Sequence, residues 1–277
     1  MEEIAEKALI RDDEVFLRMN LAERVQHILL IVSFSLLVVT GLPLMFYELR
    51  IFKSVFGFEK AFYYRGILHR TAAVILIVDI VWHSGYAILT RRGRDNFKEM
   101  IPRLKDGLDA VALFGYNVGL SRWLTRKGIL RKFFDRRPFW RFENPPEYGR
   151  YNFVEKLEYL SVAWGSFVMI ISGFFMWNVD LSLKIFPLWV HDIFVIAHGY
   201  EAMLAFLAII IWHMYNVHLN PEVFPMSKIW LNGKITGHEL KTLHALEYRK
   251  TLAERQKALD AGKAEAGRDS VPTSCEE

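Results

Sequence analysis

The stretch "RGILHRTAAVILIVDIVWHSGYAILTRRG", residues 65–93, places two histidines and an aspartate inside an apolar run. The run is long enough to cross a membrane as a helix, which takes about 20 consecutive apolar residues. Ionisable side chains at membrane depth are rare, and they normally face the inside of a helix bundle, where they have a function. His69 and His83 therefore point to a working site inside a bundle of membrane helices.

The composition supports a membrane protein. The chain has 277 residues, of which 52% are hydrophobic and 14% aromatic, which is more apolar than ordinary soluble domains. Its single cysteine, Cys275, excludes a disulfide framework and a cysteine-based metal site. The basic residues flank the apolar runs instead of forming a stripe, so a nucleic-acid partner is excluded.

Four segments have the length and apolarity of membrane spans. They lie at about residues 25–46, 67–89, 157–177 and 190–217. We therefore expect an all-α integral membrane fold in which residues 24–218 form a four-helix bundle. Residues 1–23 precede the bundle, a polar loop at 91–153 interrupts it, and a tail at 219–277 ends in disorder. We also expect a short helix near Asn96–Asp109, a turn at Asn144–Gly149 and a solvated helix from Lys250 onward.

Lys and Arg counts in the connections predict the orientation. The segment through Arg24 has four, the 91–153 loop has fifteen and the tail after Val217 has nine. The two other connections have four (residues 47–65) and one (residues 179–189). Both termini and the long loop are therefore expected on the cytoplasmic side of a bacterial or archaeal inner membrane.

The chain also repeats itself. The segment that starts at Asn20 aligns without gaps on the segment that starts at Asn152, so that Thr40-Gly41 meets Ser172-Gly173. The second and fourth spans correspond more loosely, with His69 at the place of His198 and His83 at the place of His213. The bundle is therefore expected to consist of two repeated helical hairpins, although Tyr159 stands where the first repeat has His27.

The spacing of the histidines predicts pairs at two depths. Fourteen residues are close to four helical turns, so His69 and His83 share a face about 21 Å apart. The second and fourth helices run in the same direction, so His69 comes level with His198 near the outer surface. His83 or another inner histidine comes level with His213. Imidazoles that face each other across an apolar core are what the iron of a bis-histidine haem needs.

Other residues suit haem. Gly41 and Gly173 lie at the depth of the outer pair and leave room for a flat macrocycle. Four basic residues are placed to pair with haem propionates: Arg65, Arg70, Arg24 and Lys156. A zinc site is a weaker hypothesis than haem, because a tetrahedral site needs three or four ligands at one level. The alternative without a cofactor is a set of structural histidines that hydrogen-bond between helices.

The sequence resembles the cytochrome b (gamma) subunits of membrane formate dehydrogenases and the related cytochromes b of nickel–iron hydrogenases and thiosulfate reductase. The likeness rests on "AERVQHILLIVSFSLLVVTGL", "GILHR", "PPEYGRYNFVEKLEYLSVAWGSFVMIISGF" and "WHMYNVHLNPEVFPM", and it covers residues 17–230. It implies a dihaem cytochrome b that is linked to menaquinone or ubiquinone. The implied partner is an iron–sulfur subunit or a multihaem c-type cytochrome subunit.

The resemblance also implies ligands. It assigns the outer haem to His69 and His198, and the inner haem to His27 and His213. A further likeness to the second helix of bc-type cytochromes b would instead pair His83 with His213, so the second inner ligand stays open. A third haem on the remaining histidines stays open too. The quinone pocket is expected from Tyr159, Asn216, His218 and whichever of His27 and His83 holds no iron.

We therefore expect a membrane electron-transfer subunit of a respiratory oxidoreductase complex. It would carry electrons across the membrane between a redox partner at the outer face and the quinone pool, and it would not be catalytic alone. The alternative is a haem-free membrane anchor or a small transporter with structural histidines.

Overall fold

The computed structural model describes residues 9–50, 52–53, 59–118 and 146–269, and the chain divides into two compact units. The larger unit, residues 19–101 and 154–233, is here called the bundle. The smaller unit consists of the described parts of residues 1–18, 102–153 and 234–277, and it is called the terminal unit.

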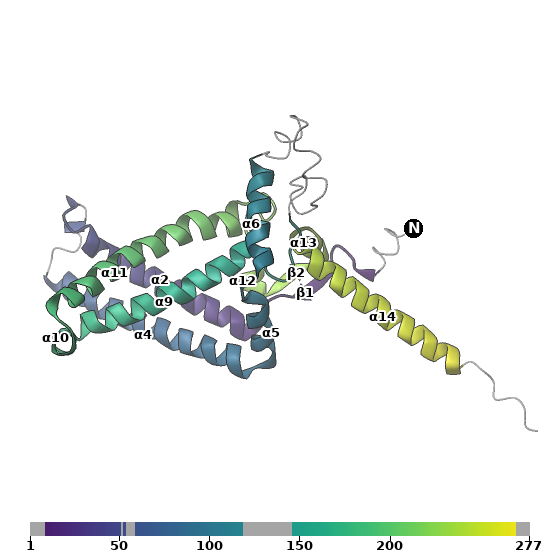
Figure 1. Cartoon of the computed structure of the whole chain (residues 1–277), viewed down its shortest axis with the longest axis horizontal. Helices are drawn as coiled ribbons and strands as arrows, with labels where there is room; N and C mark the ends of the chain where they lie inside the picture. The colour runs from purple at the N-terminus through teal and green to yellow at the C-terminus, as the bar shows by residue number, and fades with distance from the viewer. Residues whose placement is uncertain (1–8, 51, 54–58, 119–145, 270–277) are drawn as a thin grey trace, which may run out of the picture. The chain divides into compact units, whose positions relative to one another are not determined.

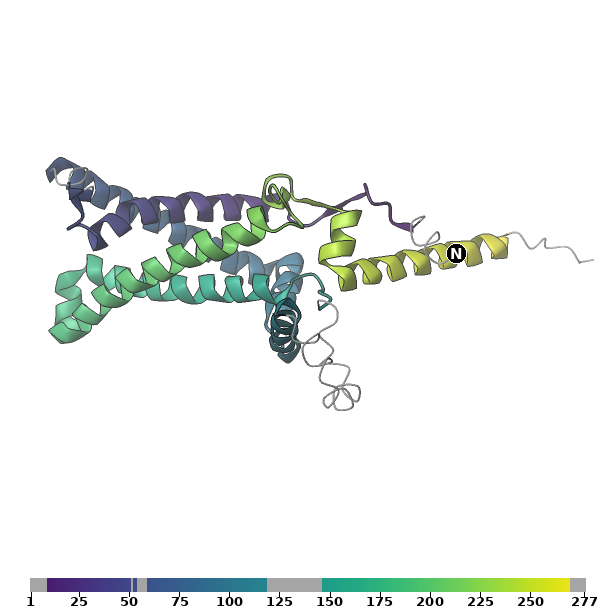
Figure 2. The same cartoon turned by 90° about the horizontal axis from the view of Figure 1, so that it is seen from above.

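The bundle contains four long helical segments that lie alongside one another (Figure 1 and Figure 2). They are α2 (Leu21–Met45), α4 (Glu59–Leu89), α9 (Phe153–Trp177), and a fourth segment made of α11 (Leu188–Leu207), η2 (Ala208–His213) and η3 (Tyr215–Leu219). All four are long and apolar enough to cross a membrane. The prediction of four spans is confirmed, and each helix is longer than its predicted apolar part.

Shorter helices lie at the two ends of the bundle. One end carries α10 (Val179–Ile185), and the other carries α5 (Arg91–Met100) and α12 (Ile229–Asn232). We call these the α10 end and the α5 end. Helix α2 starts at the α5 end with a complete capping box, in which the Asn20 side chain accepts from the backbone N–H of Glu23 and the Glu23 carboxylate accepts from the backbone N–H of Asn20.

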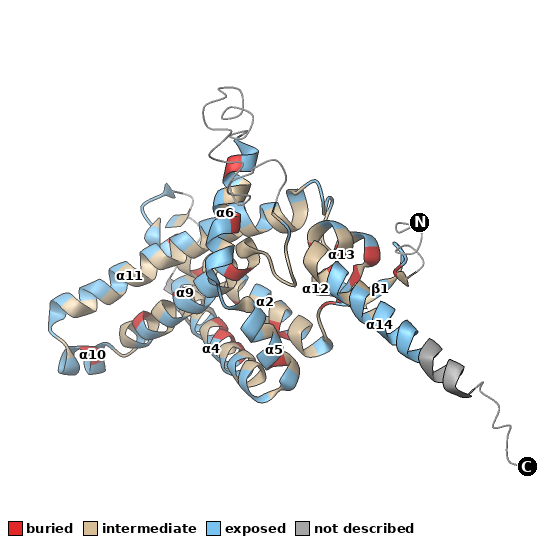
Figure 3. Cartoon of the chain, turned by 45° about the vertical axis from the view of Figure 1, so that its right-hand side comes forward, coloured by how far each residue is buried: buried red, intermediate tan, exposed pale blue. Residues whose placement is uncertain are grey.

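The burial of side chains in the spans is the reverse of that in a soluble protein (Figure 3). Large apolar residues lie on the outside; Val81, for example, is 66% exposed and Ile211 65%. Small and polar residues lie inside, among them Ser33, Thr40 and Ser172. Such an exterior is stable only against an apolar solvent, so the spans are built to face lipid.

The fourth span is not a uniform α-helix. Its second half is π-helical, at Ala208–His213 and again at Tyr215–Leu219. His198 and His213 are fifteen residues apart, one more than the four-turn spacing of His69 and His83. The extra residue predicts a local irregularity between the two histidines, and the π-helical turns confirm it.

The terminal unit joins distant parts of the sequence. Strand β1 (Val15–Leu17) pairs antiparallel with β2 (Lys234–Thr236), with Phe16 opposite Ile235. Helices α13 (Gly237–Leu243) and α14 (Ala245–Asp269) follow β2, and α6 (Leu104–Asn117) also belongs to this unit. The described part of the chain is mostly helical, in agreement with an all-α membrane fold. The sequence pattern did not indicate the two short strands.

The core of the terminal unit is small and partly ionic. Ile10, Leu240 and Tyr248 form its apolar centre. Glu247 accepts hydrogen bonds from Arg18 Nη1 at 2.8 Å and from Arg150 Nη1 at 3.0 Å. The start of α14 is thus packed through the buried Tyr248. In the helix that was expected to be solvated from Lys250 onward, Leu252 packs partly buried against this core.

Two further expectations for the polar loop need correction. Instead of one short helix near Asn96–Asp109 there are two, α5 and α6, with Pro102 between them. Proline has no backbone N–H and forces the preceding residue into an extended conformation, which is the conformation of Ile101. The turn predicted at Asn144–Gly149 falls partly outside the described residues, since 119–145 are not described.

Candidate functional site

His69 of α4 and His198 of α11 face each other towards the α10 end of the bundle. Their ring centroids are 6.4 Å apart and their planes are inclined by 64°. They do not hydrogen-bond to each other. Each Nδ1 instead meets a hydroxyl group on the preceding helix, Thr40 Oγ1 at 2.8 Å from His69 and Ser172 Oγ at 2.9 Å from His198.

These hydroxyl groups determine which ring nitrogen carries the proton. Thr40 Oγ1 lies 2.6 Å from the carbonyl oxygen of Leu36, and Ser172 Oγ lies 2.6 Å from that of Val168. A hydroxyl group has one proton, and here it is donated to its own helix. The hydroxyl oxygen must therefore accept from the imidazole, so Nδ1 is protonated and Nε2 keeps its lone pair.

Two glycines leave the space that these imidazole rings occupy. A Cβ atom on Gly41 would lie 3.0 Å from His69 Cε1, and one on Gly173 would lie 3.1 Å from His198 Cε1. Both distances are shorter than ordinary carbon contacts, so a larger side chain would push either imidazole out of place. The two glycines make the same contact at matched positions of the sequence repeat.

A second pair lies nearer the α5 end. The rings of His27 on α2 and His213 at the end of η2 have centroids 6.5 Å apart, with planes inclined by 57°. His213 Nδ1 is 3.0 Å from Glu158 Oε2 of α9. His27 Nδ1 is buried and has no hydrogen-bond partner among the described residues.

His83 does not join this pair. Its Nδ1 is 3.0 Å from Gln26 Oε1, and its Nε2 is 3.1 Å from Tyr159 Oη. Both ring nitrogens thus have polar partners. The sequence left open whether His27 or His83 accompanies His213, and the structure brings His27 to it.

Both pairs have the spacing of two imidazoles on one metal ion. A metal–nitrogen bond to imidazole is about 2.0 Å long and the nitrogen lies about 1.1 Å from the ring centroid, so two axial imidazoles place their centroids about 6 Å apart. The observed 6.4 and 6.5 Å match that geometry. Among the described residues no group of three or more His, Cys, Asp or Glu side chains could hold a metal ion, so a tetrahedral zinc site does not fit.

The model of the prokaryotic cytochrome b561 family matches residues 18–225, about three quarters of the chain. The chain belongs to this family. It is a multi-pass membrane cytochrome b of hydrogenase type from a prokaryote, and its family binds haem b and transfers electrons. No curated protein matches the sequence.

The basic residues expected at haem propionates occupy different surroundings in this cytochrome b. Arg65 Nη1 donates to the Thr40 carbonyl at 2.7 Å, and Arg24 Nη1 donates to the Leu231 carbonyl at 2.7 Å. The Nε atoms of both are buried without a hydrogen-bond partner. Arg70 stacks its guanidinium over the ring of Trp177, and Lys156 is buried.

Of the residues expected at a quinone, two lie together in this cytochrome, Tyr159 and the inner histidine that does not face His213. Tyr159 contacts His83, as described above. Asn216 Nδ2 donates to the carbonyl of Trp212 on its own helix, and His218 lies in η3 at the end of the fourth span.

Two partners were missed by the sequence reasoning. Gln26 and Glu158 contact the Nδ1 atoms of His83 and His213, yet neither was singled out. A signal was present, because both stand at the same position of the repeat, one residue before His27 and Tyr159. The aspartate of the opening stretch, Asp79, is buried and only 5% exposed, and the acidic Glu201 of the fourth span is half-buried.

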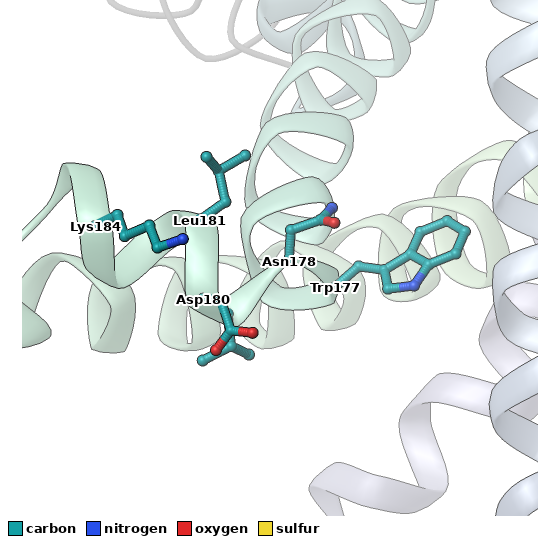
Figure 4. A pocket seen from close by; sticks show the side chains of 6 residues that line it. Trp177, Asn178, Asp180, Leu181 and Lys184 are labelled. Carbon is teal, nitrogen blue, oxygen red and sulfur yellow. The ribbon is translucent and has the colours of Figure 1, made fainter.

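A shallow hollow lies where α9 passes into α10 (Figure 4). Its volume is about 440 Å³, and it is lined by Trp177, Asn178, Val179, Asp180, Leu181 and Lys184. These lining residues include none of the histidines of the cytochrome. The hollow is therefore distinct from the imidazole pairs.

Proposed function

We propose that this cytochrome b carries two b-type haems, one between His69 and His198 and one between His27 and His213. The observation that supports this most directly is the spacing of the two imidazole pairs. When bound, each haem iron takes up and releases a single electron. The chain's own contribution is to hold the imidazoles, to orient them and to exclude lipid and water.

The groups that orient His69 and His198 support a haem at the α10 end. Thr40 and Ser172 keep the Nδ1 protons in place, which leaves Nε2 of His69 and His198 as the iron-binding nitrogens. Gly41 and Gly173 keep the space beside the two rings open. Metal-ligating histidines usually donate their other N–H to such an acceptor, so this pair has the partners that a ligand pair needs.

We assign the basic residues to the haem propionates. Arg65 and Arg24 each have a buried Nε without a hydrogen-bond partner, and such a donor favours an anion at its position. Arg70 and Lys156 lie near the same two levels of the sequence repeat and are assigned the same role. The guanidinium groups would neutralise carboxylates at either level.

We further propose that the protein is a subunit of a respiratory oxidoreductase complex that exchanges electrons with quinone. Near the α5 end, His83 and Tyr159 are hydrogen-bonded to each other, and Tyr159 would exchange this bond for one to a quinone carbonyl. The positive charge in the long loop and the tail supports a cytoplasmic position for this end. The redox partner, an iron–sulfur or c-type haem subunit, would then dock at the opposite face.

The visible spectrum of the purified full-length protein tests the proposal. Two b-type haems per chain are expected by pyridine haemochrome assay, with a reduced alpha band. A correctly inserted preparation with no haem would contradict the proposal and favour a haem-free anchor or transporter with structural histidines.

Replacement of a single ligand tests the pairing. His198→Ala is expected to remove one haem and leave the other, because His198 faces only His69. Asn178→Ala, in the hollow beside α10, is the matched control and should retain both. Retention of two haems in His198→Ala would rule out this pair.

A further inference from the structure

Four of the histidines on α4 and on the fourth span share one arrangement. In each, Nδ1 meets a side chain of the preceding long helix. The pairs are His69 with Thr40 at 2.8 Å, His83 with Gln26 at 3.0 Å, His198 with Ser172 at 2.9 Å and His213 with Glu158 at 3.0 Å. The two acceptors on α2 are fourteen residues apart, and so are the two on α9. Each long helix thus presents two acceptors on one face.

Glu158 differs chemically from the other three acceptors. Thr40, Ser172 and Gln26 are neutral, and the first two accept through hydroxyl oxygens. Glu158 is a carboxylate, and its second oxygen, Oε1, is buried without a hydrogen-bond partner. The imidazole of His213 is therefore the hydrogen-bond donor that this carboxylate faces.

The charge on the acceptor changes how strongly the imidazole ring donates electrons to the iron. To bind iron through Nε2, His213 must keep its proton on Nδ1, and that proton is then donated to Glu158. A hydrogen bond to a carboxylate is stronger than one to a hydroxyl group and draws the proton further from the ring. The ring becomes a better electron donor, and a better donor stabilises ferric iron relative to ferrous iron.

We propose that Glu158 is a positioning residue that lowers the reduction potential of the haem at His27 and His213. The haem at His69 and His198 has neutral acceptors only, so Glu158 gives the two sites of this nearly repeated chain acceptors of different charge. This inference rests on the proposed function, because it needs both haems to be present.

The test is a potentiometric titration of the b haems in the full-length protein, within its complex where one is isolated. Glu158→Gln keeps the size of the acceptor and removes its charge, and Glu158→Ser installs the acceptor used at Ser172. Both should raise the potential of one haem, so that its reduced-to-oxidised ratio at a fixed ambient potential rises several-fold. A tenfold rise corresponds to about 59 mV for one electron.

Two variants serve as controls. Glu158→Asp keeps the charge and should restore the wild-type potential. Ser172→Ala removes the neutral acceptor of His198 and should move only the other component of the titration.

Four outcomes would overturn the inference while the haems themselves remain as evidence for the proposed function. They are an unchanged potential in both neutral variants, a downward shift, an equal shift of both haems, and loss of one haem in both neutral variants. The last would mean that Glu158 is needed to hold the ligand rather than to set its potential. A protein that never contained haem would instead refute the proposed function.

Discussion

At the scale of single residues, His27 and His83 show how one hydrogen bond separates a ligand from a structural histidine. They lie on adjacent helices, and each faces a ring on the other half of the bundle. His83 faces Tyr159, whose hydroxyl group occupies its Nε2 at 3.1 Å. His27 faces His213 without a hydrogen bond between them, and 6.5 Å separate the two centroids.

The difference leads to a prediction about haem content. His27→Ala should lower the haem content from two per chain to one, because it removes an axial ligand. His83→Ala should leave two haems, because its ring nitrogens bond to Gln26 and Tyr159 instead. Pyridine haemochrome assay of both variants, normalised to protein, makes the measurement. The opposite pattern would assign the inner ligand to His83.

Single residues also show which part of the site could be predicted from the sequence and which part could not. His69 and His198 were predicted as a pair because their depth follows from helix length alone. The choice between His27 and His83 needs the rotation of α2 against α4 and of η2 against α9, which depends on packing. The π-helical turns before His213 change that rotation, and no residue pattern states by how much.

At the scale of elements, a single carboxylate, that of Glu23, connects the start of α2 to α4 and α5. Glu23 accepts hydrogen bonds from the Asn20 backbone at 2.8 Å and from Asn96 at 2.7 Å. It also accepts from Tyr86 Oη and from Arg92 Nε, both at 3.1 Å. The capping box of α2 is thereby tied to α4 and α5.

Loss of this carboxylate is expected to destabilise the bundle. Glu23→Ala removes the Glu23 half of the capping box of α2 and leaves several half-buried donors without their acceptor, at a cost of about 2–3 kcal/mol. The free energy of unfolding in detergent, followed by denaturant titration, measures it. The exposed Glu48→Ala is the control, with a change of less than about 0.5 kcal/mol expected. Equal effects of the two substitutions would show that the Glu23 contacts contribute little.

Element prediction succeeded where periodicity was long and failed where it was short. Four apolar runs of span length left little choice, and all four became helices. The strands β1 and β2 have three residues each, too few for an alternating pattern, and they come from opposite ends of the chain. Pro102 was visible in the sequence and should have divided the predicted helix in the polar loop.

At the scale of the whole molecule, the uneven charge predicts how the chain lies in the membrane. Phosphatase fused after Asp180 should be active, because the segment between the third and fourth spans is expected outside. Green fluorescent protein fused after Asp269 should fluoresce, because the tail is expected inside. Activity at the two positions in the reverse pattern would invert the orientation and place the His27–His213 pair near the outer face.

The terminal unit should be sensitive to acid. Its His244 is buried and donates from Nδ1 to the Gly149 carbonyl at 2.9 Å. Burial, together with the positive charges of Arg18 and Arg150, outweighs the hydrogen bond to Gly149 and lowers the pKa of His244 from 6.5 to about 3. Between these values the unfolded unit binds a proton that the folded unit does not, so stability falls as the pH drops below about 6.5.

The expected loss is about 2 kcal/mol between pH 7 and pH 5, since each pH unit below the unfolded pKa contributes about 1.4 kcal/mol. The rate of protease cleavage within residues 234–269 of the full-length protein, compared at both pH values, measures this loss of stability. His244→Gln carries no titrating group and should show a smaller increase in cleavage on acidification than the wild type. A wild type and variant that respond alike would attribute the acid sensitivity to other groups.

The π-helical turns of the fourth span also bear on insertions and deletions. A π turn holds one residue more than an α turn, so removing one residue from Ala208–Trp212 would restore α-helical geometry between His198 and His213 and leave the π turn at Tyr215–Leu219. His198 and His213 would then have the fourteen-residue spacing of His69 and His83. The same deletion between His69 and His83 would rotate His83 by about 100° away from Gln26. In this protein, deletion of one residue is therefore expected to be better tolerated in the fourth span than in α4, although both helices carry paired histidines.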